Sequence, residues 1–359
     1  MANPGLSTLA DIAGQLPQEI PGATRQYNRL AVTASTISTE AGQGKNIAHD
    51  AEMDGALAGS YAEGTDVLTT EFNVDVWQLA VLNWANYRSS FQVSENKIDA
   101  AMTSRGGFEI LGKFFAENVM SSTGKLASVQ NVDSIVGTGV DGSGNPTIVG
   151  LFGGALSPTG TYAGINRSAY PLWAGNSLGN GGVGRPLSID LLNQGESAIS
   201  FATGEGFDCI WTSYAVVNRY KNLFEIETRQ VRDLGSDSEV AGFDAGTSKV
   251  SFMGIPVLRD RDFDKNGQSG SLVMGNSKFI KRIYLPPTVG DGIIEGEEVE
   301  LENGESTNGD GIVTSLNMPY KVFSLFKGGD SYKVTVKNVC NQLVTRPAAF
   351  CTITDLLTV

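Results

Sequence analysis

The sequence predicts an α+β protein with an extended N-terminal arm, a long hairpin and a body of two lobes, and three observations predict it. The chain has 359 residues, about twice the length of a typical single domain. Stretches that favour β structure near both ends enclose a helical stretch and a region in which helix and strand alternate. Only 18% of the residues are charged, against about 25% in a typical soluble domain. Much of the surface must therefore be neutral, as is common where a surface faces other subunits.

The beginning of the chain predicts two elements without a core of their own. Residues 1–30 are expected to form an extended arm, because their apolar residues are too scattered for a long amphipathic helix and prolines interrupt them. Residues 31–92 predict a two-sided hairpin with its tip near 44–64. An isolated hairpin is marginally stable in water, so this one is expected to lean on other parts of the structure. The prolines of the arm are Pro4, Pro17 and Pro21.

A helix is predicted over residues 95–122, where apolar side chains recur on one face. A glycine-rich tract follows from Gly137 to Gly184. It contains apolar stretches at 148–151 and 170–173, so we expect an ordered loop rather than a flexible linker. The apolar residues of the helix are Ile98, Met102, Phe108, Leu111, Phe115 and Val119.

Residues 185–285 predict alternating helices and strands. Ser188 is expected to cap one helix, and either Thr212 or Ser213 is expected to cap a second. The strands expected in this region cover residues 207–211, 250–258 and 271–274.

The last part of the chain begins with an acidic segment, residues 289–312, which contains eight acids and no Lys or Arg. Such a run is most simply a solvated insertion. The chain then returns to β structure. A strand is predicted over 332–337, where polar and apolar residues alternate, and a last one over 348–353.

Charge and composition exclude several classes of function. The chain carries 26 Lys and Arg against 39 Asp and Glu, a net charge of −13, without the basic run that binds nucleic acid through its phosphates. No stretch reaches the roughly 18 apolar residues of a membrane span. Residues 1–24 hold no Lys or Arg for a secretory signal. Three cysteines without a C-x-x-C pair predict neither a disulfide framework nor a zinc site.

Three glycine-containing motifs match a nucleotide site on paper and fail in their context. Gly137–Gly142 and Gly179–Gly184 spell the dinucleotide pattern G-x-G-x-x-G. Neither has the required strand before it, helix after it and acid about 20 residues further on. Residues 107–114 resemble a phosphate-binding loop, but Phe114 stands where the Ser or Thr that binds Mg²⁺ belongs.

Two further motifs and the single histidine also fail to define a site. Gly175–Gly179 forms a G-x-S-x-G elbow, but no histidine follows it. Residues 262–267 begin like a calcium loop, but Val273 stands where a bidentate Glu is required. His49 lies in a polar stretch and is expected to be a solvated surface group. The sequence therefore predicts no catalytic, cofactor-binding or metal-binding residue.

Four phrases follow one another along the chain as Arg167–Trp173, Phe207–Ser213, Phe252–Asp260 and Arg346–Ile353. In this order they resemble the major capsid proteins of tailed bacteriophages, which have the Hong Kong 97-type capsid fold. The first resembles the family's Arg-x-x-Tyr-Pro-x-Trp phrase, and the second resembles the strand–helix unit of its axial domain. The third is similar to its aromatic-x-Gly-Ile-Pro-Val strand, and the fourth to the closing strand of its peripheral domain.

The resemblance implies a division of the chain. Residues 1–30 would form the N-terminal arm and 31–92 the E-loop. The peripheral (P) domain would comprise 93–185 and 316–359, with a spine helix at about 105–122. The axial (A) domain would comprise 186–315 and carry the acidic insertion 289–312.

The resemblance also implies a structural function without catalysis. Such a chain would assemble with itself, through hexamers and pentamers, into an icosahedral shell around the double-stranded DNA genome of a phage. It would be assembled in the host cytoplasm and reside in the virion. A portal and a separate scaffolding protein would be its partners, a decoration protein remains open, and DNA would be touched only loosely and without sequence preference. The alternative is an encapsulin-type nanocompartment shell of the same fold.

Some members of the family join their subunits through a lysine–asparagine isopeptide bond. The resemblance would place Lys45 in the E-loop, and Asn338 and Asn341 in the closing segment. The reaction needs a buried acid to take the proton of the lysine, yet no acid lies between Asp330 and Asp355. The sequence therefore predicts shells held by non-covalent contacts alone.

Overall fold

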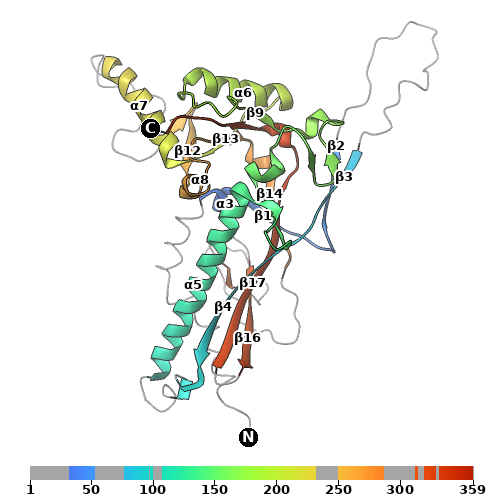
Figure 1. Ribbon diagram of the computed structural model, residues 1–359, viewed down its shortest axis with the longest axis vertical. Coiled ribbons are helices and arrows are strands. Elements are labelled where there is room, and N and C mark those ends of the chain that lie inside the picture. Colours follow the sequence, from blue (N-terminus) through green and yellow to red (C-terminus); the bar gives the residue numbers. More distant parts are fainter. Residues whose placement is uncertain are drawn as a thin grey trace, which may run out of the picture.

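The computed structural model describes residues 32–52, 77–96, 98–99, 107–231, 250–286, 312–313, 319–328 and 331–358. The predicted arm, residues 53–76 of the predicted hairpin and all of the acidic segment except Ile312 lie outside them. The long helix α5 (Gly107–Val136) runs beside a sheet of long strands, and a second body with the helices α6 and α7 lies beyond its C-terminal end (Figure 1).

Helix α5 begins and ends later than the sequence predicts. A helix was expected over 95–122, with a spine helix at about 105–122 implied by the resemblance, whereas α5 begins at Gly107 and continues to Val136. The apolar period stops after Val119 because the second half of the helix buries a polar face against its neighbours. The polar residues buried on that half are Ser122, Thr123, Gln130, Asn131 and Ser134.

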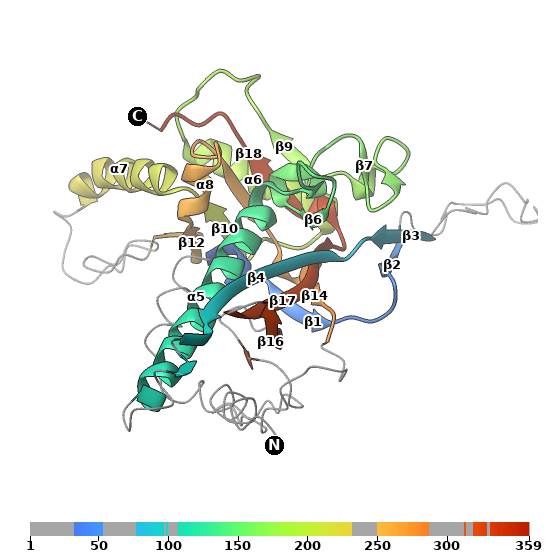
Figure 2. The same cartoon turned by 60° about the horizontal axis from the view of Figure 1, so that its bottom comes forward.

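The first sheet, called the long sheet here, has β17 at its centre. β17 pairs antiparallel with β4, β14 and β16, and β1 and β15 extend the sheet. Gln130 of α5 donates a hydrogen bond to Asn338 of β17, so the helix covers the face on which Val336 and Cys340 are buried (Figure 2). The strands are β1 (Ser38–Ala41), β4 (Ala85–Ser94), β14 (Ile280–Tyr284), β15 (Ile312–Val313), β16 (Pro319–Gly328) and β17 (Ser331–Val344).

The second sheet, called the upper sheet, has the order β11-β12-β10-β13-β18-β9. Every residue of its three central strands β10, β13 and β18 is buried, and such a strand shows no alternation of polar and apolar residues. The strands are β9 (Asn176–Leu178), β10 (Cys209–Thr212), β11 (Ser251–Phe252), β12 (Ile255–Arg259), β13 (Leu272–Gly275) and β18 (Phe350–Ile353).

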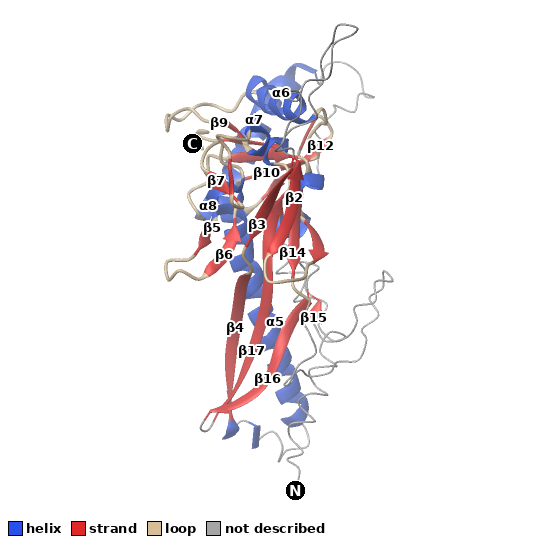
Figure 3. Cartoon of the chain, turned by 90° about the vertical axis from the view of Figure 1, so that its right-hand side faces the viewer, coloured by secondary structure: helices blue, strands red, loops and turns tan. Residues whose placement is uncertain are grey.

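Three helices accompany the upper sheet: α6 (Ile189–Thr203), α7 (Tyr214–Val231) and α8 (Arg261–Lys265) (Figure 3). The predicted cap of α6 is confirmed, since the side chain of Ser188 accepts a hydrogen bond from the amide of Leu191. Of the two candidates for α7, Ser213 is the cap, because its hydroxyl accepts from the amide of Val216 at 3.1 Å.

The glycine-rich tract is an ordered series of short elements packed on the core, as its apolar stretches predict. Arg167 is buried in it, and its guanidinium donates to the carbonyls of Ala155, Thr159 and Trp173 at 2.9–3.2 Å. The indole of Trp173 stacks on Tyr162 with ring centroids 5.7 Å apart. The elements are β5 (Thr138–Val140), β6 (Pro146–Val149), η2 (Leu151–Ala155), β7 (Thr161–Tyr162), β8 (Ile165–Asn166) and η3 (Pro171–Trp173).

Three predicted strands have different limits in the structure. The strand expected over 250–258 is a tight hairpin, because Met253 and Gly254 adopt φ values of 52° and 81° and reverse the chain between β11 and β12. The strand expected over 332–337 extends to 331–344. The last strand begins at Phe350, after the short helical turn η5 (Pro347–Ala349).

The strand pairing also differs from the predicted domain boundaries. β18 lies in the upper sheet with β10 and β13, although it was expected in the peripheral domain. β14 lies in the long sheet, although residues 186–315 were expected to form the axial domain. Pairing partners over such sequence separations follow from the tertiary fold, and the local pattern of a strand does not encode them.

The contact between β13 and β18 allows a first prediction. A Cβ atom added to Gly275 would lie 2.0 Å from a ring carbon of Phe350, which is fully buried. We expect Gly275→Ala to lower the free energy of unfolding by about 2–3 kcal/mol, because the ring has no room to move. Urea denaturation of the unassembled chain measures it. Gly206→Ala is the control, since nothing lies within 4 Å of its added Cβ, and equal stability of the two variants would contradict the packing described.

Candidate assembly surfaces

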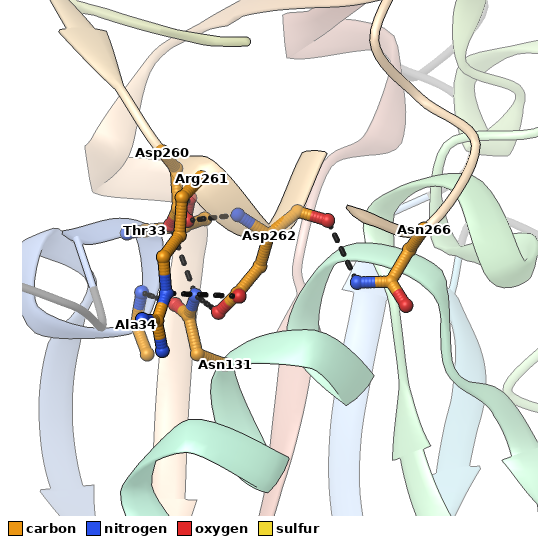
Figure 4. A network of polar contacts seen from close by, with 7 residues as sticks. All are labelled: Thr33, Ala34, Asn131, Asp260, Arg261, Asp262 and Asn266. Atoms are coloured by element: carbon orange, nitrogen blue, oxygen red, sulfur yellow. Dashed lines mark hydrogen bonds and ion pairs between the residues drawn. The ribbon is translucent and has the colours of Figure 1, made fainter. Parts of the chain in front are cut away.

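A buried carboxylate joins three distant parts of the chain. Asp260 is fully buried at the start of α8 (Figure 4). Its Oδ2 accepts hydrogen bonds from the amide of Thr33 at 2.9 Å, from the hydroxyl of Thr33 at 2.8 Å and from the side-chain amide of Asn131 at 3.0 Å. Its Oδ1 accepts from the amide of Asp262 at 2.9 Å. Four donors therefore stabilise this carboxylate in place of water.

Asn131 links the long helix α5 to the start of the described chain at Ala34 and to Asp262 in α8. Its Oδ1 accepts a hydrogen bond from the amide of Ala34 at 2.9 Å, and its Nδ2 donates to Asp260 and, at 2.7 Å, to Asp262. Burial raises the pKa of Asp262 above its usual range, although the hydrogen bond from Asn131 opposes the shift. The guanidinium of Arg261 lies 3.4 Å from the same carboxylate. We call this group of contacts the junction.

The junction fixes the short helix α3 (Val32–Thr36), where the described part of the chain begins. Besides Asp260 and Asn131, the indole of Trp211 donates to the hydroxyl of Thr36 at 2.9 Å. The guanidinium of Arg282, which is fully buried, donates to the carbonyl of Ala34 at 3.4 Å and to the hydroxyl of Ser134. Side chains of α5, β10 and β14, together with Asp260 at the N-cap of α8, thus hold three of the five residues of α3.

The sequence did not predict the junction, although the calcium-loop motif considered above includes one of its residues, Asp262. Residues 262–267 were considered as a calcium loop and rejected. In the structure Asp264 accepts a hydrogen bond from the amide of Tyr214 at 3.0 Å, and Asn266 donates to the carbonyl of Asp262 at 2.7 Å. The charged and polar groups of this stretch are therefore used to hold helix ends. The signal that remained was the pair Asp260 and Asp262 directly after the strand β12.

The other rejected motifs also lie in ordinary elements. Residues 107–114 form the first turns of α5, and Ser177 lies in β9. Within the described ranges, no three His, Cys, Asp or Glu side chains gather closely enough to hold a metal ion. All three cysteines are buried and unpaired, and burial raises the pKa of Cys340 and of Cys351 to about 12.

The hairpin of β2 (Ile47–Glu52) and β3 (Trp77–Leu82) has one buried and one exposed side. Ile47 and Ala51 are buried in the core. The sequence placed these residues near the tip of the hairpin, but in the structure they form its root. On the other side Trp77 is 61% exposed and Leu79 is 57% exposed. Two large apolar side chains on one strand edge form a surface that a partner can cover.

A cavity of about 670 Å³ lies at the root of this hairpin. Its lining includes His49 and Trp77 from the hairpin, Trp173, and Phe279 from the turn η4 (Ser277–Phe279). His49 is half-buried, in contrast to the predicted solvated position, and burial lowers its pKa. The cavity therefore lies between the hairpin and the body of the molecule.

The asparagines of the possible cross-link are buried and engaged. Asn338 is 4% exposed and accepts a hydrogen bond from Gln130 at 2.9 Å. Asn341 is 2% exposed, and its side-chain amide donates to the carbonyl of Asn83 at 2.6 Å. Lys45 is exposed. Neither asparagine is accessible to an incoming amine without a rearrangement of the long sheet.

A half-buried acid, Asp133, does lie on α5, outside the closing segment 330–355. The hydroxyl of Tyr87 donates to Asp133 at 2.6 Å, and Tyr87 pairs with Asn338 across β4 and β17. Burial raises the pKa of Asp133, an effect that the hydrogen bond from Tyr87 opposes and the charge of Asp141 assists. Burial also raises the pKa of Tyr87 strongly.

Comparison with known proteins identifies the fold. No family model matches the sequence, and no curated protein matches the chain. The capsid asymmetric unit of cyanophage A-1(L) matches 93% of this chain and 93% of its own, with a TM-score of 0.65 and 17% identity. The capsid of the native GTA particle matches 91% of this chain and 90% of its own, with a TM-score of 0.54 and 12% identity.

A third solved structure belongs to a different kind of shell. The holo-SrpI encapsulin complex from Synechococcus elongatus PCC 7942 matches 91% of this chain and 88% of its own, with a TM-score of 0.50 and 10% identity. The chain thus has the α+β fold of tailed-phage capsid subunits, which confirms the predicted fold class and resemblance. The three neighbours are two capsids and an encapsulin complex. Among the described helices, none combines the length and apolar character needed to cross a membrane.

The junction predicts a large effect for a single truncation. Asp260→Ala leaves the amide and the hydroxyl of Thr33 buried without their acceptor, and it removes one of the two acceptors of the Asn131 side-chain amide. We expect the free energy of unfolding to fall by about 3 kcal/mol. Asp208→Ala is the control: Asp208 also accepts two hydrogen bonds, both from Ser277, but it is exposed, so about 1 kcal/mol or less is expected. Equal losses in urea denaturation would show that the junction is not a structural centre.

Asp133 predicts a dependence of stability on pH. Because its folded pKa is raised, the native state binds more protons than the unfolded chain above the ordinary Asp range near pH 4, and stability falls as pH rises through that interval. Asp133→Asn cannot ionise and keeps an acceptor for Tyr87. Its stability relative to wild type should therefore increase from pH 4 to pH 7. Asp141 has a lowered pKa, so its contribution to stability changes only below about pH 4. Asp141→Asn should therefore keep a nearly constant stability relative to wild type from pH 4 to pH 7, and parallel curves for both variants would contradict the assignment.

The buried asparagines predict that assembled particles separate completely in detergent. Particles boiled in detergent and reductant should give one band near 38.0 kDa on a denaturing gel. A ladder of pentamer- and hexamer-sized bands would contradict this prediction. Lys45→Arg, which keeps the charge and removes the reactive amine, would then show whether Lys45 forms the bond.

Proposed function

We propose that this protein is the major capsid protein of a tailed bacteriophage, a non-enzymatic subunit that assembles through hexamers and pentamers into an icosahedral shell around double-stranded DNA. The observation that carries the proposal is the extent of the match to the cyanophage capsid subunit, 93% of both chains at a TM-score of 0.65. The net charge of −13 supports it, because an acidic shell repels packaged DNA and leaves it mobile.

The structure supports assigning the parts of the chain to roles in the shell. We assign residues 1–30 to the N-terminal arm and the hairpin within 31–92 to the E-loop. Helix α5 and the long sheet form the peripheral domain, and the upper sheet with α6 and α7 forms the axial domain. By strand pairing, β14 then belongs to the peripheral domain and β18 to the axial domain.

The proposed partners follow from the same assignment. The chain binds other copies of itself, a portal at one vertex and a separate scaffolding protein, with a decoration protein as a further candidate. DNA is contacted only loosely, and no membrane is involved. Assembly takes place in the host cytoplasm, and the protein resides in the virion.

A nanocompartment shell of the encapsulin type is the second candidate. The match to the SrpI encapsulin complex favours it, because the same fold then encloses a cargo enzyme in place of a genome. Co-purification separates the two: DNA and a portal accompany a phage shell, and a loaded enzyme accompanies a compartment.

Negative-stain microscopy of the expressed chain tests the proposal. We expect shells, tubes or rings, and we expect the double variant Trp77→Ser/Leu79→Ser to lose them while its thermal unfolding stays close to wild type. Val140→Ser is the control, because Val140 is 56% exposed on a different hairpin. Wild-type chain that remains a uniform monomer would contradict assembly, and unchanged shells from the double variant would contradict a role for the β2–β3 hairpin.

A further inference from the structure

The cavity at the hairpin root is positively charged in an acidic chain. Among the described residues of its lining, Lys278, Lys281 and Arg346 contribute three cations and Asp50 contributes one carboxylate. His49 adds little charge at neutral pH, because burial lowers its pKa. The carboxylates of Glu205 and Glu40 pair with Lys278 and Lys281 from outside this lining. An anionic group that enters the cavity therefore meets Arg346 directly and competes with these two exposed pairs for the lysines.

The cations are held in place and remain open to a new partner. The amine of Lys278 lies 5.4 Å from the ring centroid of Phe279, and the guanidinium of Arg346 lies 5.8 Å from the same centroid. Lys278 pairs with Glu205 at 3.1 Å and Lys281 pairs with Glu40 at 2.9 Å. Both pairs are solvent-exposed, and such pairs contribute about 0–1 kcal/mol, so a run of several carboxylates can compete with them. No carboxylate of the described residues forms an ion pair with Arg346.

The acidic segment leaves the long sheet close to this cavity. The amide of Leu285 bonds to the carbonyl of Val339, four residues after Lys281. At about 3.3 Å per residue, Leu285 lies about 13 Å from that lysine, and the acidic segment begins four residues further on. It returns at Ile312, which pairs with Tyr320 on the same sheet. The intervening chain of about 25 residues can extend to about 80 Å, which is enough to reach the cavity and come back.

We propose that the chain's own acidic segment, residues 289–312, binds in this cavity. Five glutamates between Glu295 and Glu302 supply the carboxylates, and Lys278, Lys281 and Arg346 receive them. A tethered segment is present at a millimolar effective concentration, whereas an external polyanion must approach a molecule of strongly negative charge. The segment would thus brace the hairpin root against the body of the subunit.

Zero-length carbodiimide cross-linking with peptide mass spectrometry tests the proposal, because it joins an amine to a carboxylate only in direct contact. Lys278 and Lys281 should be linked to glutamates of the segment 295–302. Links of Lys278 to Glu205 and of Lys281 to Glu40 are internal standards. Lys125, which is exposed on α5, is the matched control and should give no link to the segment.

A substitution adds a gain of signal that misfolding cannot produce. Arg346 cannot react with the reagent, but Arg346→Lys places an amine there and should add a link to the segment. Standards that form without any link from Lys278 or Lys281 to the segment would overturn the proposal, and so would equal linking of Lys125. Mixing ¹⁵N-labelled and unlabelled chains before assembly shows whether the linked segment and lysine belong to the same chain. Links found only between a labelled and an unlabelled peptide would overturn binding within one chain. Loss of the links on adding short DNA duplexes, with the standards intact, would assign the cavity to nucleic acid instead.

Discussion

The burial of one carboxylate, Asp260, is the constraint on which the arrangement of the lobes depends. A carboxylate removed from water carries a penalty of several kcal/mol unless its oxygens are satisfied by hydrogen bonds. Here the donors come from residue 33, residue 131 and residue 262, which are far apart in the chain. The penalty is offset only when α3, α5 and α8 are all in place, so a single side chain couples the start of the body, the long helix and the upper sheet.

The same principle extends along the second half of α5. Apolar contacts tolerate small shifts of one element against another, whereas hydrogen bonds require a definite distance and direction. Gln130 bonds to Asn338 of β17, and Ser134 receives a hydrogen bond from Arg282 of β14. The helix is therefore positioned on the long sheet by directional contacts, and its register against two strands is set by them.

This polar face also explains how far the sequence could predict the fold. The helix caps at Ser188 and Ser213 and the α+β class follow from local signals, because a cap and an apolar period are properties of neighbouring residues. The C-terminal half of α5 escaped prediction because polar residues interrupt its buried face, so that Leu126 and Ile135 alone do not continue the apolar period beyond Val119. The places of β14 and β18 escaped as well, since a strand buried on both faces does not specify its partner. The junction was out of reach for a related reason: Thr33, Asn131 and Asp260 are ordinary polar residues until the fold brings them together.

The hairpin shows why such a chain is suited to assembly. Its inner side is fixed by Ile47 and Ala51 in the core, so the root cannot detach without losing buried apolar surface. Its outer side keeps Trp77 and Leu79 in water, and in the described part of the chain nothing covers them. Burying both side chains against a neighbour would contribute about 3 kcal/mol at most, too little for a stable dimer, since association itself costs at least that much. Repeated around a closed ring and over a shell, the same contact is reinforced by every neighbour. A weak, fixed and repeated contact of this kind favours a large symmetric assembly over a strong pair.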